Sequence, residues 1–143
     1  MSAHSFLDSL VGYALRRAQL KVFQHLVGSL AEHDLRPAEL TALAIIQDEP
    51  GLMQAELARQ LAIDPPQLVP LLNKLEKRGL AERVRAQQDK RAYGVFLTAE
   101  GQALLEPLKA LAAQSDLAAT APLTDSEREQ LLALLHKIDT APL

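Results

Sequence analysis

A long run of regularly spaced apolar residues near the start of the chain most constrains its fold. From residue 5 to residue 33, apolar side chains recur at steps of three and four, as they do on a helix. One continuous helix of that length would measure ~43 Å. The core of a 143-residue chain cannot cover such a helix. The excess apolar surface therefore predicts a partner, and a second copy of the chain is the simplest one.

The overall composition is that of a globular, Leu- and Ala-rich chain. Apolar residues make up 48% of the sequence and charged residues 23%, so disorder is not indicated. The absence of Cys excludes disulfides, thiolate metal sites and a cysteine nucleophile. No apolar run reaches the roughly 18 residues of a membrane span, and residues 1–10 lack the basic start of a signal peptide. We therefore expect a soluble, cytoplasmic protein that does not bind membranes.

Proline, glycine and capping residues divide the rest of the chain into shorter helices. Pro37 and Pro65 suit the first position of a helix, where a missing N–H costs little. Asp64, Thr98 and Thr124 are suitable N-caps. The helices predicted after the first one span 37–47, 54–61, 65–79, about 99–119 and 124–140.

Between the fourth and fifth predicted helices, the periodicity changes to that of strands. Residues 83–86 and 93–97 are short extended segments of alternating character. The polar segment 87–91 between them is long enough to close a hairpin. The fold class expected is therefore mainly α with a small β-hairpin.

The charges are unevenly distributed along the chain. The net charge is −3, yet residues 73–91 carry seven of the 15 basic residues and a net charge of +4. A basic segment in an acidic protein indicates one surface that faces a polyanion. A solvated helix end followed by a charged hairpin would also produce this pattern.

A short helix, a tight turn, a second helix and a hairpin with a charged tip form a winged helix-turn-helix. In this motif the second helix enters the DNA major groove, and its N-terminal residues lie closest to the bases. The hairpin, called the wing, lies along the backbone or reaches the minor groove. The basic segment falls on the end of this helix and on the wing, so charge and topology both predict binding to double-stranded DNA.

The segment from about residue 35 to residue 101 resembles the MarR family of transcriptional regulators. Three stretches carry the resemblance: Gln54-Ala55-Glu56-Leu57-Ala58; Leu75-Glu76-Lys77-Arg78-Gly79-Leu80 followed by Arg83; and Asp89-Lys90-Arg91 leading to Leu97-Thr98 and Gly101. The resemblance implies a homodimer on a pseudo-palindromic operator and repression that a small ligand relieves. It also implies an N-terminal dimerisation helix (1–34), a winged domain (35–100) and C-terminal dimerisation helices (101–143).

The predicted recognition helix departs from the family pattern in its middle. Members often carry a hydroxyl and a basic residue where this chain has Val69 and Pro70. Pro70 cannot bond to the carbonyl of Pro66, so we expect the first turn to be kinked or displaced. Gln67 can pair with adenine, and Pro66 can touch a thymine methyl. Gln67 could instead be solvated.

Phosphate contacts and the wing complete the predicted DNA interface. Lys74 and Lys77 suit phosphates. Arg91 either reaches the minor groove or pairs with Asp89 to hold the wing. Arg83 and Arg85 share a strand face that either meets phosphates or is only solvated. The predicted DNA-binding residues are Pro66, Gln67, Asn73, Lys74, Lys77, Arg83, Arg85, Lys90 and Arg91, with Asp89 as a wing-stabilising residue.

The first helix carries the predicted ligand-binding residues Tyr13, Arg16 and Arg17. The segment 12–17 (Gly-Tyr-Ala-Leu-Arg-Arg) resembles the first helix of family members that respond to aromatic carboxylic acids or their thioesters. An Arg side chain can bond a carboxylate with two parallel hydrogen bonds, and Arg16 is favoured because it follows Tyr13 by one turn. Either Arg could instead pair with an acid across a dimer.

Metal and enzyme sites are not indicated. His25 and His33 lie eight residues apart, which is not a metal-ligand spacing. No phosphate loop, nucleophile elbow or His/Asp pair is present. We expect neither a cofactor nor catalysis. The alternative function is a winged-helix protein-interaction module with weak DNA binding, which the unusual Pro70 motivates.

Overall fold

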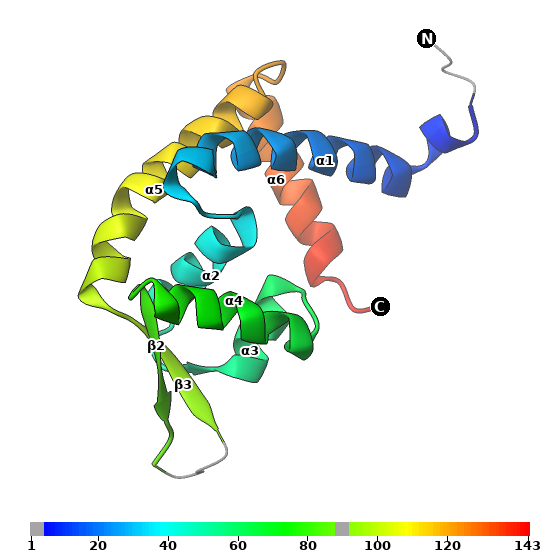
Figure 1. Ribbon diagram of the computed structural model, residues 1–143. Coiled ribbons are helices and arrows are strands. Elements are labelled where there is room, and N and C mark those ends of the chain that lie inside the picture. The colour runs from blue at the N-terminus through cyan, green and yellow to red at the C-terminus, as the bar shows by residue number, and fades with distance from the viewer. Residues whose placement is uncertain (1–4, 88–91) are drawn as a thin grey trace. The chain divides into compact units, whose positions relative to one another are not determined.

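The computed structural model describes residues 5–87 and 92–143 and consists mainly of helices (Figure 1). The helices are α1 (Val11–Leu30), α2 (Pro37–Asp48), α3 (Gln54–Leu61), α4 (Pro65–Lys77), α5 (Ala99–Ala119) and α6 (Asp125–Thr140); the strands are β1 (Leu52–Met53), β2 (Ala81–Arg85) and β3 (Tyr93–Leu97); 3-10 turns lie at Leu7–Ser9 and Ala31–His33. The predicted fold class, mainly α with a winged helix-turn-helix, is confirmed.

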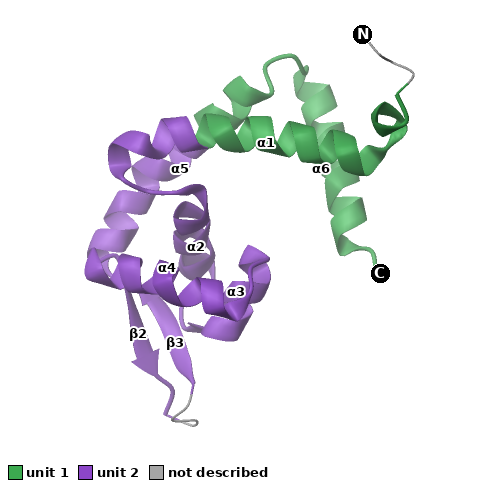
Figure 2. Ribbon diagram, turned by 45° about the vertical axis from the view of Figure 1, so that its right-hand side comes forward, with its two compact units in different colours: residues 1–26, 113–143 green, residues 27–112 purple. Residues whose placement is uncertain are grey.

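The chain forms two compact units, coloured separately in Figure 2. Residues 27–112 form one unit, which contains α2, α3, α4 and the sheet. Residues 1–26 and 113–143 form the other, which contains α6. Helices α1 and α5 contribute residues to both units.

The single helix predicted for residues 5–33 is wrong at both ends. Leu7–Ser9 is a 3-10 turn, and Leu10 is extended. The Ser9 hydroxyl donates to the Phe6 carbonyl at 2.6 Å, a local bond that competes with helix formation. At the other end, Asp34 adopts a left-handed conformation with φ 51° and closes a second 3-10 turn. Helix α1 is therefore 20 residues long, or ~30 Å.

Buried apolar residues from helices and strands alike build the core of the 27–112 unit. Leu68, Leu72 and Leu75 lie on one face of α4 and are buried. Leu43 and Ile46 of α2, Leu57 of α3 and Val95 of β3 are fully buried as well. Burial of this face holds α4 in place and leaves its opposite face exposed.

The wing belongs to an antiparallel sheet with the strand order β1-β3-β2. Arg83 of β2 pairs with Val95 of β3 in the predicted hairpin. Strand β1 was not predicted. It has two residues, too few to show a period, and it exists because Leu52 pairs with Val95.

The family motif residues after the recognition helix fix where α5 begins. The Thr98 hydroxyl donates to the Gly79 carbonyl at 2.6 Å and accepts a bond from the Gly101 N–H at 3.0 Å. A Cβ at position 101 would lie 2.0 Å from the Leu80 carbonyl oxygen, so this position requires glycine. Arg78 donates to the carbonyls of Asp34 and His33 at 2.8 and 3.2 Å and joins the end of α4 to the turn after α1.

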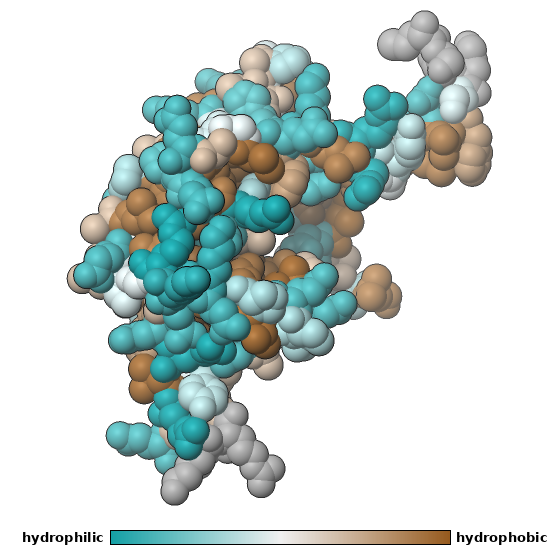
Figure 3. All heavy atoms as spheres, viewed as in Figure 1, coloured by the Kyte–Doolittle hydropathy of each residue, from teal (hydrophilic) through white to brown (hydrophobic). Residues whose placement is uncertain are grey.

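The unit of residues 1–26 and 113–143 exposes much apolar surface. No residue of α6 is buried, although Leu131, Leu132, Leu134 and Ile138 lie on it. Of the 20 described residues of α1, Leu30 alone is buried. Brown apolar side chains reach the surface over the N-terminal part of the chain in Figure 3. Apolar area of this extent is typical of an interaction surface.

Candidate nucleic-acid interface and effector site

Helix α4 presents a polar and proline-rich face to solvent. It runs from Pro65 to Lys77 with Pro70 inside it, so Pro70 does not end the helix, and the kink expected at this position stays a prediction. The side chains exposed along it include those of Pro66, Gln67, Val69, Pro70, Asn73 and Lys77. This face carries the residues that were predicted to meet the major groove.

Gln67 has a structural partner at the start of α4. Its side-chain oxygen accepts a hydrogen bond from the Asp64 N–H at 3.1 Å, one half of a capping box. The predicted bidentate pairing with adenine needs the same oxygen and the amide N–H. Because an amide oxygen has two lone pairs, Gln67 would have to share its oxygen between the capping bond and the base.

Lys74 is directed toward α2 by a buried carboxylate. Its Nζ lies 3.2 Å from both oxygens of Glu39, and Glu39 is only 5% exposed. Glu39 also accepts a bond from the Arg36 N–H at 2.7 Å and thereby caps α2. The Lys74 charge is thus partly neutralised within the protein. Lys77, one turn later, is exposed.

Asn73 and Arg83, two predicted DNA-binding residues, contact each other. Arg83 Nη2 donates to Asn73 Oδ1 at 2.8 Å, and Arg83 Nε is in close contact with Glu76 Oε1. One guanidinium on β2 therefore binds two side chains of α4. Glu76 was not predicted as a site residue, although its spacing of three from Asn73 places both on one helix face.

Arg85, the next arginine on the same strand face, bonds within the wing instead. Its Nη2 donates to the Tyr93 hydroxyl at 2.9 Å, and its guanidinium lies 5.5 Å from the centre of the Tyr93 ring. These contacts extend Arg85 across the hairpin while it stays exposed. The predicted tip residues Asp89, Lys90 and Arg91 lie outside the described residues.

The predicted ligand residues on α1 are partly brought together. Arg17 Nη1 donates to the Tyr13 hydroxyl at 3.4 Å and lies 5.9 Å from the ring centre. This hydrogen bond raises the pKa of the Arg17 guanidinium, so its positive charge is secure. Arg16 is exposed on α1.

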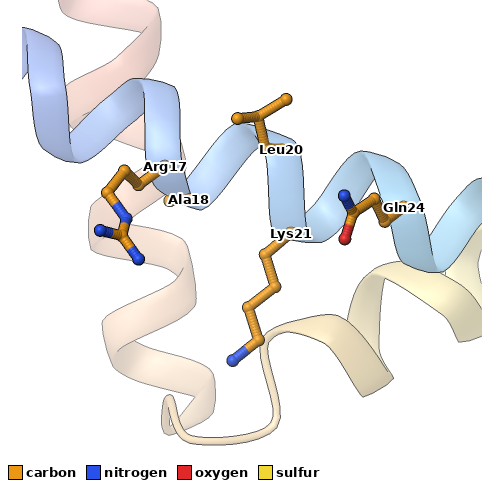
Figure 4. A pocket seen from close by; sticks show the side chains of 5 residues that line it. All are labelled: Arg17, Ala18, Leu20, Lys21 and Gln24. Carbon is orange, nitrogen blue, oxygen red and sulfur yellow. The ribbon is translucent and has the colours of Figure 1, made fainter.

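A shallow hollow of about 510 Å³ lies along the same helix and includes Arg17 but neither Tyr13 nor Arg16. Its lining residues are Arg17, Ala18, Leu20, Lys21 and Gln24. Figure 4 shows that Arg17 and Lys21 project from the same side of α1, whereas Leu20 projects the other way. Lys21 and Gln24 were not predicted, although their i+4 and i+7 spacing from Arg17 was visible in the sequence.

No group of three His, Asp or Glu side chains that could hold a metal ion lies within residues 5–87 and 92–143. In that same part of the chain, every helix is too short or too polar to span a bilayer.

Comparison with protein families gives one match, to the MarR family over residues 33–92. Among curated proteins, an HTH-type transcriptional repressor of Mycobacterium tuberculosis is 29% identical over 131 residues, which cover 92% of this chain and 94% of the relative.

Solved structures give similarity over nearly the whole chain. The transcriptional repressor CouR, bound to a 23-mer DNA duplex, superposes with a TM-score of 0.89 at 36% identity over 97% of this chain and 98% of that one. Bordetella bronchiseptica BpsR, whose DNA binding is regulated by 6-hydroxynicotinic acid, superposes with a TM-score of 0.88 at 25% identity over 97% and 99% of the two chains.

Proposed function

The chain belongs to the MarR family of transcriptional regulators, and we propose that it binds operator DNA as a homodimer and represses transcription until an organic acid releases it. The observation that carries this proposal is the similarity over 97% of the chain to a repressor solved on a DNA duplex. Relatives in this family are non-enzymatic DNA-binding proteins, and the same is proposed here.

The DNA-facing surface of this proposal is the exposed face of α4 together with the wing. Pro66, Gln67 and Asn73 are placed toward the major groove, and Lys77 and Arg85 toward phosphates. Asp89, Lys90 and Arg91, which lie outside the described residues, stay in this proposal as predictions from the sequence. Because few side chains on α4 can read bases, sequence-dependent DNA shape contributes much of the specificity.

Dimerisation is supported by the apolar surface of the unit of residues 1–26 and 113–143. Phe6 and Val11 are 74% and 65% exposed, and Leu134 and Ile138 on α6 are 58% and 57% exposed. A second copy that covers these side chains would place two winged units on one duplex. Two half-sites on a pseudo-palindrome match such twofold symmetry.

The effector site is placed at the hollow beside Arg17 and Lys21. Two cations four residues apart on the same side of α1 suit a carboxylate, and Ala18 and Leu20 add apolar lining to the hollow. BpsR, which 6-hydroxynicotinic acid regulates, supports an aromatic acid as the ligand class. Tyr13 holds Arg17 in this arrangement, and Arg16 lies outside the hollow.

The test of DNA binding is fluorescence anisotropy of the purified protein on the duplex upstream of its own gene, beside a scrambled duplex and at two salt concentrations. We expect binding at least ~10³-fold tighter to a specific site than to scrambled DNA, and weakening with salt. Equal, weak binding to both, and to duplexes selected from genomic fragments, would favour the winged protein-interaction module. The observation that favours this second function is that two predicted DNA-binding cations contact the protein itself. Lys74 pairs with Glu39, and Arg83 contacts Asn73 and Glu76.

The effector test titrates aromatic carboxylates, including 6-hydroxynicotinate, into the protein–DNA complex. We expect one of these acids to release the DNA. The concentration of that acid needed for release should rise at least tenfold in Arg17→Ala and in Lys21→Ala. Arg16→Ala is the matched control, because it removes the same charge from the same helix outside the hollow. If Arg16→Ala had an equal effect, the proposal that the acid binds at the hollow would be wrong.

A further inference from the structure

The contact between β2 and α4 assigns a role to Arg83 that differs from a phosphate contact. We propose that Arg83 is a positioning residue, which binds Asn73 and Glu76 and thereby sets the angle between the wing and the recognition helix. The proposal rests on the proposed DNA-binding function, because it concerns how two DNA-binding elements are oriented.

The first support is the geometry of the guanidinium. Arg83 Nη2 donates to Asn73 Oδ1 at 2.8 Å, while Nε faces Glu76 Oε1. The two partners are one turn apart on α4, so a single planar group spans one turn of the recognition helix. The more compact ammonium of a lysine cannot reach both partners in this way.

The second support is burial. The Arg83 side chain is 26% exposed and that of Glu76 33%. Glu76 Oε1 itself is shielded from solvent and accepts no hydrogen bond, so its contact with Arg83 is an ion pair. An ion pair with a shielded oxygen is screened by water less than an exposed pair. Moving Arg83 onto a phosphate would leave this carboxylate oxygen without its cation, which is costly.

The third support is the position of Arg83 along the wing. It is the middle residue of β2 and lies opposite Val95, two residues before the strand ends. Gln87 follows four residues later, about 13 Å along an extended chain. A tilt of about 10° at Arg83 would therefore move Gln87 by roughly 2 Å, which is enough to misplace contacts to a groove.

The decisive experiment uses Glu76→Gln, because the two roles predict opposite signs. If Glu76 merely restrains an arginine that binds phosphate, this substitution frees Arg83 and removes a negative charge, so DNA binding tightens. If Arg83 positions the wing, the substitution loosens it, and we expect binding to weaken five- to tenfold. The DNA is the tightest duplex that the wild-type protein selects from a random library.

The dependence on salt separates the roles again. Removing a phosphate contact lowers the slope of log K against log salt by about 0.9. Arg83→Met should weaken binding with the slope unchanged, and Arg83→Lys, which retains the charge, should weaken it nearly as much. Arg85→Met is the matched comparison on the same strand face. Because Arg85 is proposed to meet a phosphate, its loss should lower the slope. A slope that falls in Arg83→Met, or full binding by Arg83→Lys, would overturn the proposal.

Amide hydrogen exchange tests the same contact without DNA. Exchange at β2 amides should be at least fivefold faster in Arg83→Met and Glu76→Gln than in the wild type, and unchanged in Glu82→Gln, which alters an exposed side chain of the same strand. Unchanged exchange at β2 in Glu76→Gln would refute the positioning role. If the wild-type protein selects no duplex, the proposed function fails, while this exchange measurement still decides whether Arg83 holds the wing.

Discussion

At the scale of single residues, the polar side chains of the recognition helix bond to the protein as well as facing outward. Gln67 caps α4, Lys74 pairs with Glu39, and Asn73 accepts a hydrogen bond from Arg83. The sequence identified these positions, because exposed polar residues on a helix follow from periodicity. It did not identify their partners, since Glu39 lies 35 residues from Lys74 and comes close to it only when the chain folds.

Gln67→Glu separates the capping role from a role in DNA binding. Glutamate can still accept the Asp64 N–H, so we expect the free energy of unfolding to stay within about 0.5 kcal/mol of the wild type. It cannot donate to a base or phosphate, so DNA affinity should fall about tenfold, which is ~1.4 kcal/mol. Urea denaturation and anisotropy measure the two effects, and unchanged affinity would place Gln67 outside the DNA interface.

Glu56 on α3 makes the free energy of unfolding depend on pH in the acid range. Arg59 donates to it at 2.9 and 2.5 Å and Gln60 at 3.0 Å, and these bonds lower the pKa of Glu56 to about 2. Because the folded pKa is below the unfolded value of 4.5, this contribution is present above pH 4.5 and is lost as the pH falls toward 2.

Thermal melts of Glu56→Gln and wild type should therefore differ at pH 7 and converge near pH 2. The effect is expected to be small, because the pair is exposed. A difference in Tm that persists undiminished at pH 2 would show that Glu56 contributes through something other than its charge.

At the scale of elements, the boundaries that local chemistry sets were predicted well. Helix α3 spans the predicted residues 54–61, and the Thr124–Glu127 capping box begins α6 as expected. The wrong predictions fall where a distant segment of the chain, or a side chain that bonds to the backbone, decides the local structure. Strand β1 exists only through its pairing with β3, and the Ser9 side chain favours a 3-10 turn over the helix predicted for that segment.

Gly101→Ala tests how tightly α5 is joined to the wing. The added methyl would lie 2.0 Å from the Leu80 carbonyl oxygen, so we expect a loss of about 2–3 kcal/mol in unfolding free energy. Gly12→Ala is the matched control, with no atom within 4 Å of the new Cβ, and should raise helix stability by up to ~1 kcal/mol. Urea denaturation of both variants measures this contrast, and similar effects of the two substitutions would contradict it.

At the scale of the whole molecule, the apolar residues of α1 and α6 that lie outside the core are explained by a second copy of the chain. The need for a partner was predicted from the first helix alone, although that helix is shorter than expected. The sequence did not show that α6 buries no residue within its own chain, because amphipathic spacing looks the same whether a helix packs on its own core or on a partner.

Leu134→Glu should convert the dimer into a monomer. Leu134 is 58% exposed on α6, and a buried carboxylate at an apolar interface is strongly unfavourable. Light scattering should report half the wild-type mass, and DNA affinity should fall at least ~10²-fold as the second half-site contact is lost. Glu129→Gln, on the same helix, should leave both unchanged. A Leu134→Glu variant that remains dimeric would place the interface elsewhere.

The hydrogen bond from Arg83 to Asn73 and its ion pair with Glu76 have a consequence for engineering chimaeras among related regulators. The wing of this chain, grafted into a relative, carries an arginine whose two acceptors stay behind on α4 of this chain. A graft of residues 81–97 alone would therefore dock at an angle set by whatever the host carries at 73 and 76. Exchanging those two positions together with the wing makes a transferable module, and a library built on that larger unit should yield more functional hybrids than one cut at the strand boundaries.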